Sequence, residues 1–261
     1  MKYLTLWLYR LLPLIAVLAF FGLWKWYVTA FEVSAFILPP PDQIVMALIA
    51  LLQEPTIGMH IRVTLTETLS GFALATLFGI LLGTAMGKLR WVERGLRPFV
   101  IATQVIPKIA LAPLFILWFG FGLESKIVIS AVLAFFPIFS NTLIGIKSVD
   151  RGLRDVMLSF NANALSTFWL LDIRAALPFV LTGMEVGIVL AIIGAIVGEF
   201  MGGSVGLGNL AVVTLQEMQV DTLFAVILLL ALIGVGLYLA VTMLRRLLTP
   251  WHESVSTDAA T

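Results

Sequence analysis

The sequence contains little charge and no cysteine. Only 12% of its 261 residues are Asp, Glu, Lys or Arg, whereas 61% are hydrophobic, and the mean hydropathy is +1.07. A soluble fold of this length cannot bury so much apolar surface with so few charges to cover it. The formal net charge of +1 provides no basic surface for nucleic acid. The composition therefore excludes a soluble enzyme, a disordered chain and a nucleic-acid-binding module, and it predicts an all-α, polytopic membrane protein.

Residues for metal and nucleophile chemistry are scarce. Without cysteine there is no disulfide framework, no thiolate nucleophile and no Cys-ligated metal. The two histidines, His60 and His252, lie outside the long apolar runs, so an intramembrane metal site or Ser–His dyad is not expected. The segment GTAMGKL at 83–89 has three residues between its glycines and Leu after its Lys, which does not fit a phosphate-binding loop. We therefore expect no metal, no catalytic residue and no nucleotide site in this chain.

Six apolar runs are long enough to cross a bilayer. A spanning helix needs about 20 mostly apolar residues, because the hydrocarbon core is about 30 Å thick and a helix rises about 1.5 Å per residue. In chain order the expected spans are residues 11–30, 68–87, 99–120, 127–146, 178–200 and 222–244. The first run also has the charged start and small residues of a signal peptide. The Trp-Lys-Trp cluster at 24–26 favours a retained span, because aromatic residues gather at membrane interfaces.

Lys and Arg residues are distributed unequally between the two sides of these spans. With the N-terminus inside, twelve lie in inner segments, and only Arg62 and Lys126 lie in outer ones. Since cytoplasmic loops are enriched in Lys and Arg, both termini and the loops 88–98 and 147–177 are expected to face the cytoplasm.

Two segments outside the spans have their own signals. Prolines at 39–41 stop any helix in the outer loop, and residues 42–53 are expected to form a helix along the outer interface. The polar tail 249–261 is expected to be disordered.

Small residues recur at every fourth position on two spans. Such ridges allow close backbone approach between helices in lipid. They comprise Gly79, Gly83 and Gly87 on one span, and Gly183, Gly187, Ala191, Ala195, Gly194, Gly198 and Gly202 on the other. Either internal packing or a subunit interface would use them.

Lys108 is the most informative charge within a span. It lies eleven residues after Arg97, near the bilayer midplane, and Pro107 and Pro113 are expected to break the helix around it. A midplane cation beside a broken helix suits a pathway for an anionic solute. A structural ion pair with Glu185 or Glu67 is the alternative.

Glu199 precedes the glycine-rich stretch MGGSVGLGNL at 201–210, which would serve as a gating segment or a plain loop. The expected pathway residues are Pro107, Lys108, Pro113, Glu185 and Glu199.

The loop 147–177 is long for a connection between spans, and long ordered loops are often functional. Asp150 can cap a helix with an apolar face of Leu153, Val156, Met157 and Phe160. Asn161 and Asn163 suit its end. A second helix is expected from Ser166, through Phe168, Trp169 and Leu170, to Pro178. Its apolar face would pack beneath the bundle or dock into a cytoplasmic partner.

Three segments carry a resemblance to a known family. They are KIALAPLFILWFGFGLESKIVISAVLAFFPIFSNTLIGIKSVD at 108–150, RAALPFVLTGMEVGI at 174–188 and GAIVGEFMGGSVGLGNL at 194–210. Together they resemble permease subunits of binding-protein-dependent ABC importers, in the nitrate, sulfonate, taurine and pyrimidine-precursor branch. The resemblance covers about residues 38–250 and implies a type I permease fold, one domain over 1–261 with a core of about 60–246.

The resemblance assigns a role to the loop 147–177, because in this family the loop enters a cleft of the ATPase. The family carries Glu-Ala-Ala, three residues and Gly, where this sequence has Asp155, Val156, Met157 and Asn161. Leu177 and Pro178 match the end of the extended pattern, and Arg174 stands where a Pro is common. The implied coupling residues are Asp155, Val156, Met157, Phe160, Asn161, Ala162, Phe168, Leu177 and Pro178.

The resemblance also implies partners and location. It implies an ATPase dimer that binds ATP and Mg, a periplasmic or lipid-anchored solute-binding protein, a second copy of the permease, and a lipid environment in a prokaryotic inner membrane. The solute would be a small anion such as a sulfonate, nitrate or carboxylate, or a pyrimidine-like heterocycle. A secondary transporter or channel without an ATPase is the alternative function.

Overall fold

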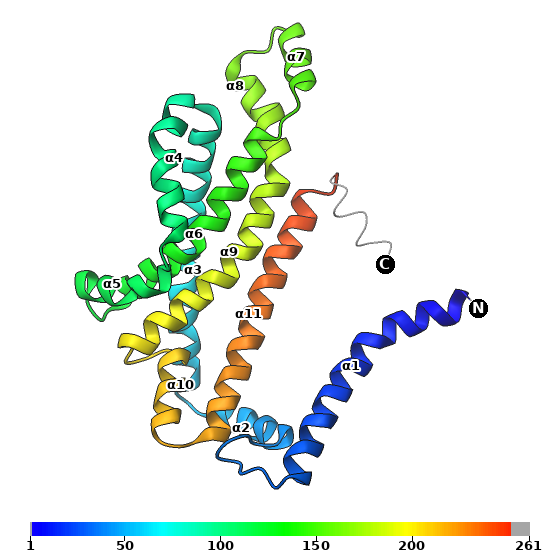
Figure 1. Cartoon of the computed structure of the whole chain (residues 1–261), viewed down its shortest axis with the longest axis vertical. Coiled ribbons are helices and arrows are strands. Elements are labelled where there is room, and N and C mark those ends of the chain that lie inside the picture. The colour runs from blue at the N-terminus through cyan, green and yellow to red at the C-terminus, as the bar shows by residue number, and fades with distance from the viewer. Residues whose placement is uncertain (1, 252–261) are drawn as a thin grey trace. The chain divides into compact units, whose positions relative to one another are not determined.

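The computed structural model describes residues 2–251, with the side chains of 12 and of 15–251. These residues form helices and no strand, as expected (Figure 1). The helices are α1 (Lys2–Ala30), α2 (Pro41–Gln53), α3 (Ile57–Lys88), α4 (Arg90–Val105), η1 (Lys108–Leu111), α5 (Ala112–Phe119), α6 (Leu123–Lys147), α7 (Arg151–Ser159), α8 (Ala164–Thr167), η2 (Phe168–Asp172), α9 (Ile173–Gly202), α10 (Leu207–Gln216) and α11 (Val220–Leu248). Most of the tail expected to be disordered, residues 252–261 with His252, lies outside the described residues.

Four stretches are long and apolar enough to cross a membrane: α3, α6, the continuous stretch Ala164–Gly202 and α11. They contain the expected spans 68–87, 127–146, 178–200 and 222–244. The expected break around Lys108 is confirmed, because α4 and the η1–α5 segment meet at a bend of 91°, and a span over 99–120 stays a prediction. Residues 15–30 of α1 form a shorter apolar helix, so the count of six spans stays a prediction.

The chain folds as two compact units, Met1–Gly58 with Leu210–Ala231, and Met59–Asn209 with Leu232–Thr261. In the first unit, Lys25 pairs with Asp42 at 3.3 Å. The helix expected at 42–53 is α2, which begins one residue earlier at Pro41, because the missing N–H of proline costs nothing in a first turn.

The second unit is built around α6, which lies beside α9 (Figure 1). Glycines bring the helices on either side of α6 into close contact with it. A Cβ at Gly83 of α3 would lie 2.7 Å from the Cβ of Thr142, and one at Gly194 of α9 would lie 2.6 Å from the Cα of Ser130. Both ridges therefore serve internal packing of this unit.

Two boundaries differ from expectation near the loop 147–177. The helix expected from Ser166 to Pro178 begins instead at Ala164, and it continues through η2 into α9 and past Pro178. Proline is tolerated inside membrane helices, and Pro178 lies buried within α9. The glycine-rich stretch 201–210 contains the end of α9, a turn at 203–206 and the start of α10.

Candidate functional site

The loop 147–177 forms a pair of short helices at one end of its unit (Figure 1). Asp150 caps α7 as expected, since its Oδ1 accepts from the Gly152 N–H at 2.6 Å. Asn161 ends this helix with φ +53°, in the left-handed conformation that asparagine tolerates. Asn163 was expected at the same helix end, but its side chain instead caps α8 by accepting from the Ser166 N–H at 2.8 Å. One asparagine therefore stops the first helix and the other starts the second.

The helix pair exposes much of its apolar surface. Phe160 is 79% exposed and Trp169 is 60% exposed, and the other exposed apolar side chains are Leu153, Val156, Leu158, Leu165 and Leu170. An exposed apolar patch of this kind is typical of a surface that binds a partner.

The implied coupling residues divide into two groups. Asp155, Val156, Phe160 and Asn161 are exposed, and Met157, Ala162 and Phe168 are half-buried beside them. Leu177 and Pro178 lie within α9 instead, where Pro178 is buried. The structure therefore brings together the first seven and separates the last two from the exposed patch.

Lys108 stands at the bend between α4 and α5. Pro107 immediately precedes η1, and Pro113 lies in the first turn of α5, so both prolines are at helix starts after the break. The Lys108 ammonium lies 5.0 Å from the centroid of the Phe136 ring. Phe136 is near the middle of α6, which agrees with the expected midplane position of the cation.

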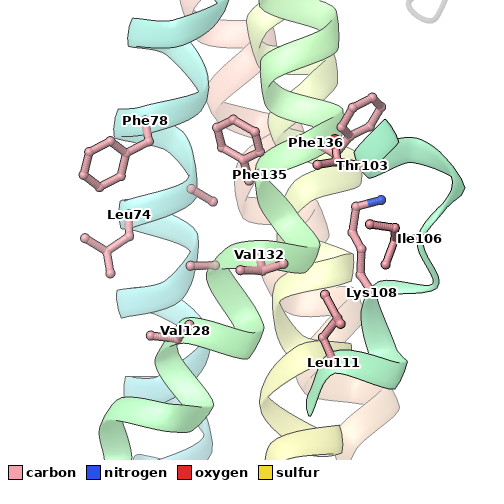
Figure 2. A pocket seen from close by; sticks show the side chains of 12 residues that line it. Leu74, Phe78, Thr103, Ile106, Lys108, Leu111, Val128, Val132, Phe135 and Phe136 are labelled. Carbon is pink, nitrogen blue, oxygen red and sulfur yellow. The ribbon is translucent and has the colours of Figure 1, made fainter. Parts of the chain in front are cut away.

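Lys108 lines a cavity of about 320 Å³ (Figure 2). Its wall is formed by α3, α6 and the bent segment, with three phenylalanine rings at Phe78, Phe135 and Phe136. Thr103 and Lys108 contribute the polar groups of its lining. The arrangement is a largely apolar chamber with one positive charge, which can hold a small solute that carries a negative group.

Among the described residues no carboxylate forms a salt bridge with the Lys108 ammonium, so the alternative of an ion pair with Glu185 or Glu67 is wrong for this conformation. Glu185 pairs instead with Arg245 at 2.9 Å. Glu67 lies beside Glu199, far along α3 from the cavity residues Leu74 and Phe78. Lys108 is thus available to a ligand.

Glu199 occupies a separate buried cluster and does not line the Lys108 cavity. Its carboxylate accepts from Thr64 Oγ1 at 2.6 Å and from the Gly208 N–H at 2.5 Å. Thr64 in turn accepts from the Leu207 N–H at 2.9 Å. The turn closes tightly, because a Cβ at Gly206, where φ is +130°, would lie 2.3 Å from the Glu199 carboxyl carbon. Glu199 therefore holds the glycine-rich turn and the start of α10 against α3.

Asp172 is a buried acid that the sequence pattern did not single out. Its side chain is fully buried at the end of the π-helical turn η2, where it pairs with Lys88 and, at 3.1 Å, with Arg154. An acidic residue inside an otherwise apolar run, with basic residues in two nearby loops, is the sequence signal that could have identified it.

These features define a multi-pass membrane protein with a lysine in a largely apolar pocket and an exposed apolar surface at one end. Residues 75–251 match the family described as the binding-protein-dependent transport system inner membrane component. The chain belongs to this family.

Several relatives are similar along most of their length. The formylaminopyrimidine transport permease protein ThiX of Halalkalibacterium halodurans is 38% identical over 84% of this chain and 87% of its own. The riboflavin transport system permease protein RibX of Chloroflexus aurantiacus is 36% identical over 88% and 86%. The taurine transport system permease protein TauC of Escherichia coli is 30% identical over 88% and 86%.

The chain is accordingly a permease subunit of an ABC importer, located in the inner membrane, and it works with an ATPase and a solute-binding protein. Family membership favours this function over a secondary transporter or channel.

Proposed function

We propose that this permease carries a small organic anion into the cytoplasm and that the loop 147–177 is its contact with the ATPase. The exposed apolar surface of α7, α8 and η2 is the observation that carries the proposal, because the loop gains nothing by exposing Phe160 and Trp169 to water. The excess of Lys and Arg on the same side supports a cytoplasmic location of this loop and of both termini.

The Lys108 cavity supports the choice of solute. A carboxylate or sulfonate can pair with the ammonium, while the rings of Phe78, Phe135 and Phe136 can contact the organic part. The relatives named for taurine, riboflavin and formylaminopyrimidine include both a sulfonate and ring compounds. A small sulfonate, a carboxylate or an acidic heterocycle fits this lining better than a cation.

The proposed assembly has two copies of this chain and two ATPase subunits, and the ATPase subunits bind ATP and Mg. ATP binding would close the ATPase pair and draw the two docked loops together. The bundle would then change from inward-facing to outward-facing, and hydrolysis would reverse the change.

Affinity purification of the chain from its own host tests the proposal. We expect an ATPase to co-purify, and ATP hydrolysis in proteoliposomes to rise when the loaded solute-binding protein is added. Removal of the loop between Asp150 and Ala175 should abolish the association. Uptake of solute by the purified chain alone would contradict the proposal.

A further inference from the structure

Asp172 is a buried carboxylate that joins three parts of the chain. It is 0% exposed and ends the π-helical turn between α8 and α9. Lys88, the last residue of α3, donates to its Oδ2, and Arg154 of α7 donates to its Oδ1 at 3.1 Å. One acid thus holds the first helix of the loop 147–177 against the inner end of α3.

The π-helical turn at Phe168–Asp172 places this acid inward. Trp169 and Leu170 in the same turn are exposed, whereas Asp172 is buried. π-helical turns are rare, interrupt the regular hydrogen bonding of an α-helix and often occur at functional sites. Phe168 adds a further contact, since the Lys88 ammonium lies 5.8 Å from its ring centroid. Lys88 therefore contacts two residues of the turn that exposes Trp169.

Lys88 is next to a helix that is packed only loosely, because none of its residues is buried. It is followed by the break at Leu89 and by α4, which buries none of its residues. A second ion pair, between Glu93 of α4 and Lys147 of α6, is at the same end. The far end of α4 carries Thr103 of the cavity wall and leads through the bend to Lys108. α4 therefore connects the Asp172 ion pairs to the cavity.

We propose that Asp172 is a positioning residue that transmits movement of the loop 147–177 through Lys88 to α4 and the Lys108 cavity. The inference rests on the proposed function, because it assumes that an ATPase moves the loop. Asp172 would transmit the movement of the loop without binding the ATPase itself, since Asp172 is buried and lies outside the exposed apolar surface that would meet the ATPase. Loss of the ion pair to Lys88 should leave the ATPase bound and uncouple its hydrolysis from transport.

The complete transporter in proteoliposomes, with its ATPase and solute-binding protein, provides the test. Asp172→Asn removes the charge that both cations share. Lys88→Met cuts only the connection to α3 and leaves Asp172 neutralised by Arg154, so it tests the proposal even if the first variant does not fold. Arg90→Met is the matched control, because it removes an exposed cation two residues away.

We expect both variants to co-purify with the ATPase at the wild-type ratio and to retain basal hydrolysis. Stimulation of hydrolysis by the loaded binding protein and solute uptake should each fall about tenfold, within the usual range of coupling free energies. The Lys88→Met/Asp172→Asn double variant should be no worse than either single variant, because all three break the same connection. Arg90→Met should behave as the wild type.

Three results would overturn the inference. Wild-type stimulation and uptake in Lys88→Met would show that the ion pair transmits nothing. Loss of the ATPase from folded Lys88→Met complexes would assign the pair to docking. Absence of any ATPase from the wild-type complex would overturn the proposed function itself, which distinguishes the two failures.

Discussion

Four charged residues in the described part of this apolar chain each have a specific partner or line a cavity. A charge inside a membrane protein is costly unless it is paired, hydrogen-bonded or placed in a polar space. Glu185 has Arg245, Asp172 has Lys88 and Arg154, and Glu199 has Thr64 with the Gly208 amide. Lys108 has only the face of an aromatic ring among the described residues, which sets it apart from the paired charges.

Replacement of Lys108 by Met should reduce uptake of an anionic solute by about tenfold, because a hydrogen bond to a charged group is lost. Lys108→Arg keeps the cation and should retain most of the uptake. Initial rates in proteoliposomes that contain equal amounts of folded permease measure the effect. Unchanged uptake by a normally folded Lys108→Met transporter would exclude Lys108 from the pathway.

Thr64→Val should destabilise the permease by about 1–3 kcal/mol, because it removes a donor to the buried Glu199 and an acceptor for the Leu207 amide. Thermal unfolding in detergent measures the change. Thr66→Val is the matched control on the same helix, since Thr66 is exposed and its hydroxyl donates only to the Arg62 carbonyl. Equal unfolding temperatures of the two variants would show that the Glu199 cluster adds no stability.

Among the helices, the pair α7 and α8 differs from the spanning helices in what its apolar residues contact. In α6 and α9 the residues that face each other are small or closely packed, so the pair forms the core of its unit. In α7 and α8 most of the large apolar residues are at least half exposed. Local capping residues determine where the two helices begin and end, and a bound partner would bury their exposed apolar side chains.

Phe160→Ala should weaken binding of the ATPase by about 2 kcal/mol, or roughly 30-fold, as expected for a large anchor residue at an interface. The amount of ATPase that co-purifies at several salt and detergent conditions provides the measurement. Phe36→Ala removes a similarly exposed ring, 69% accessible, from the segment before α2, and it should leave the ATPase ratio unchanged. Equal recovery of ATPase with both variants would argue against docking through α7.

At the scale of the whole molecule, the orientation of the chain in the membrane decides whether the loop 147–177 can meet a cytoplasmic ATPase. The proposed orientation follows from the distribution of Lys and Arg. It puts the segment before α2 and the loop 147–177 on opposite sides of the bilayer.

The absence of cysteine makes this orientation directly measurable. Phe36→Cys should react with a membrane-impermeant maleimide on intact cells, after removal of the outer barrier. Ser159→Cys should react only when the cytoplasmic side is opened. The unmodified chain supplies the background. Labelling of Ser159→Cys from outside would refute the proposed orientation and the ATPase contact with it.

Much of the architecture could be predicted from local pattern. The four long spans, the break around Lys108, the caps at Asp150 and Asn161 and the helix after the prolines at 39–41 depend on runs of neighbouring residues. The predictions that were wrong involved competition between local and tertiary effects. Pro178 was expected to end a helix, but it is accommodated inside α9. Asn163 was expected at the end of α7, but it caps the start of α8.

The sequence by itself determined which segments are apolar and long enough to span a membrane, because bilayer thickness sets helix length. It also determined where the helix pair begins and turns, because those signals are a few residues apart. Only the tertiary structure decided that Lys88 meets Asp172 across 84 residues, and that Thr64 meets Glu199 across 135. Those contacts depend on how helices far apart in the sequence pack against one another, and no local pattern of residues encodes that packing.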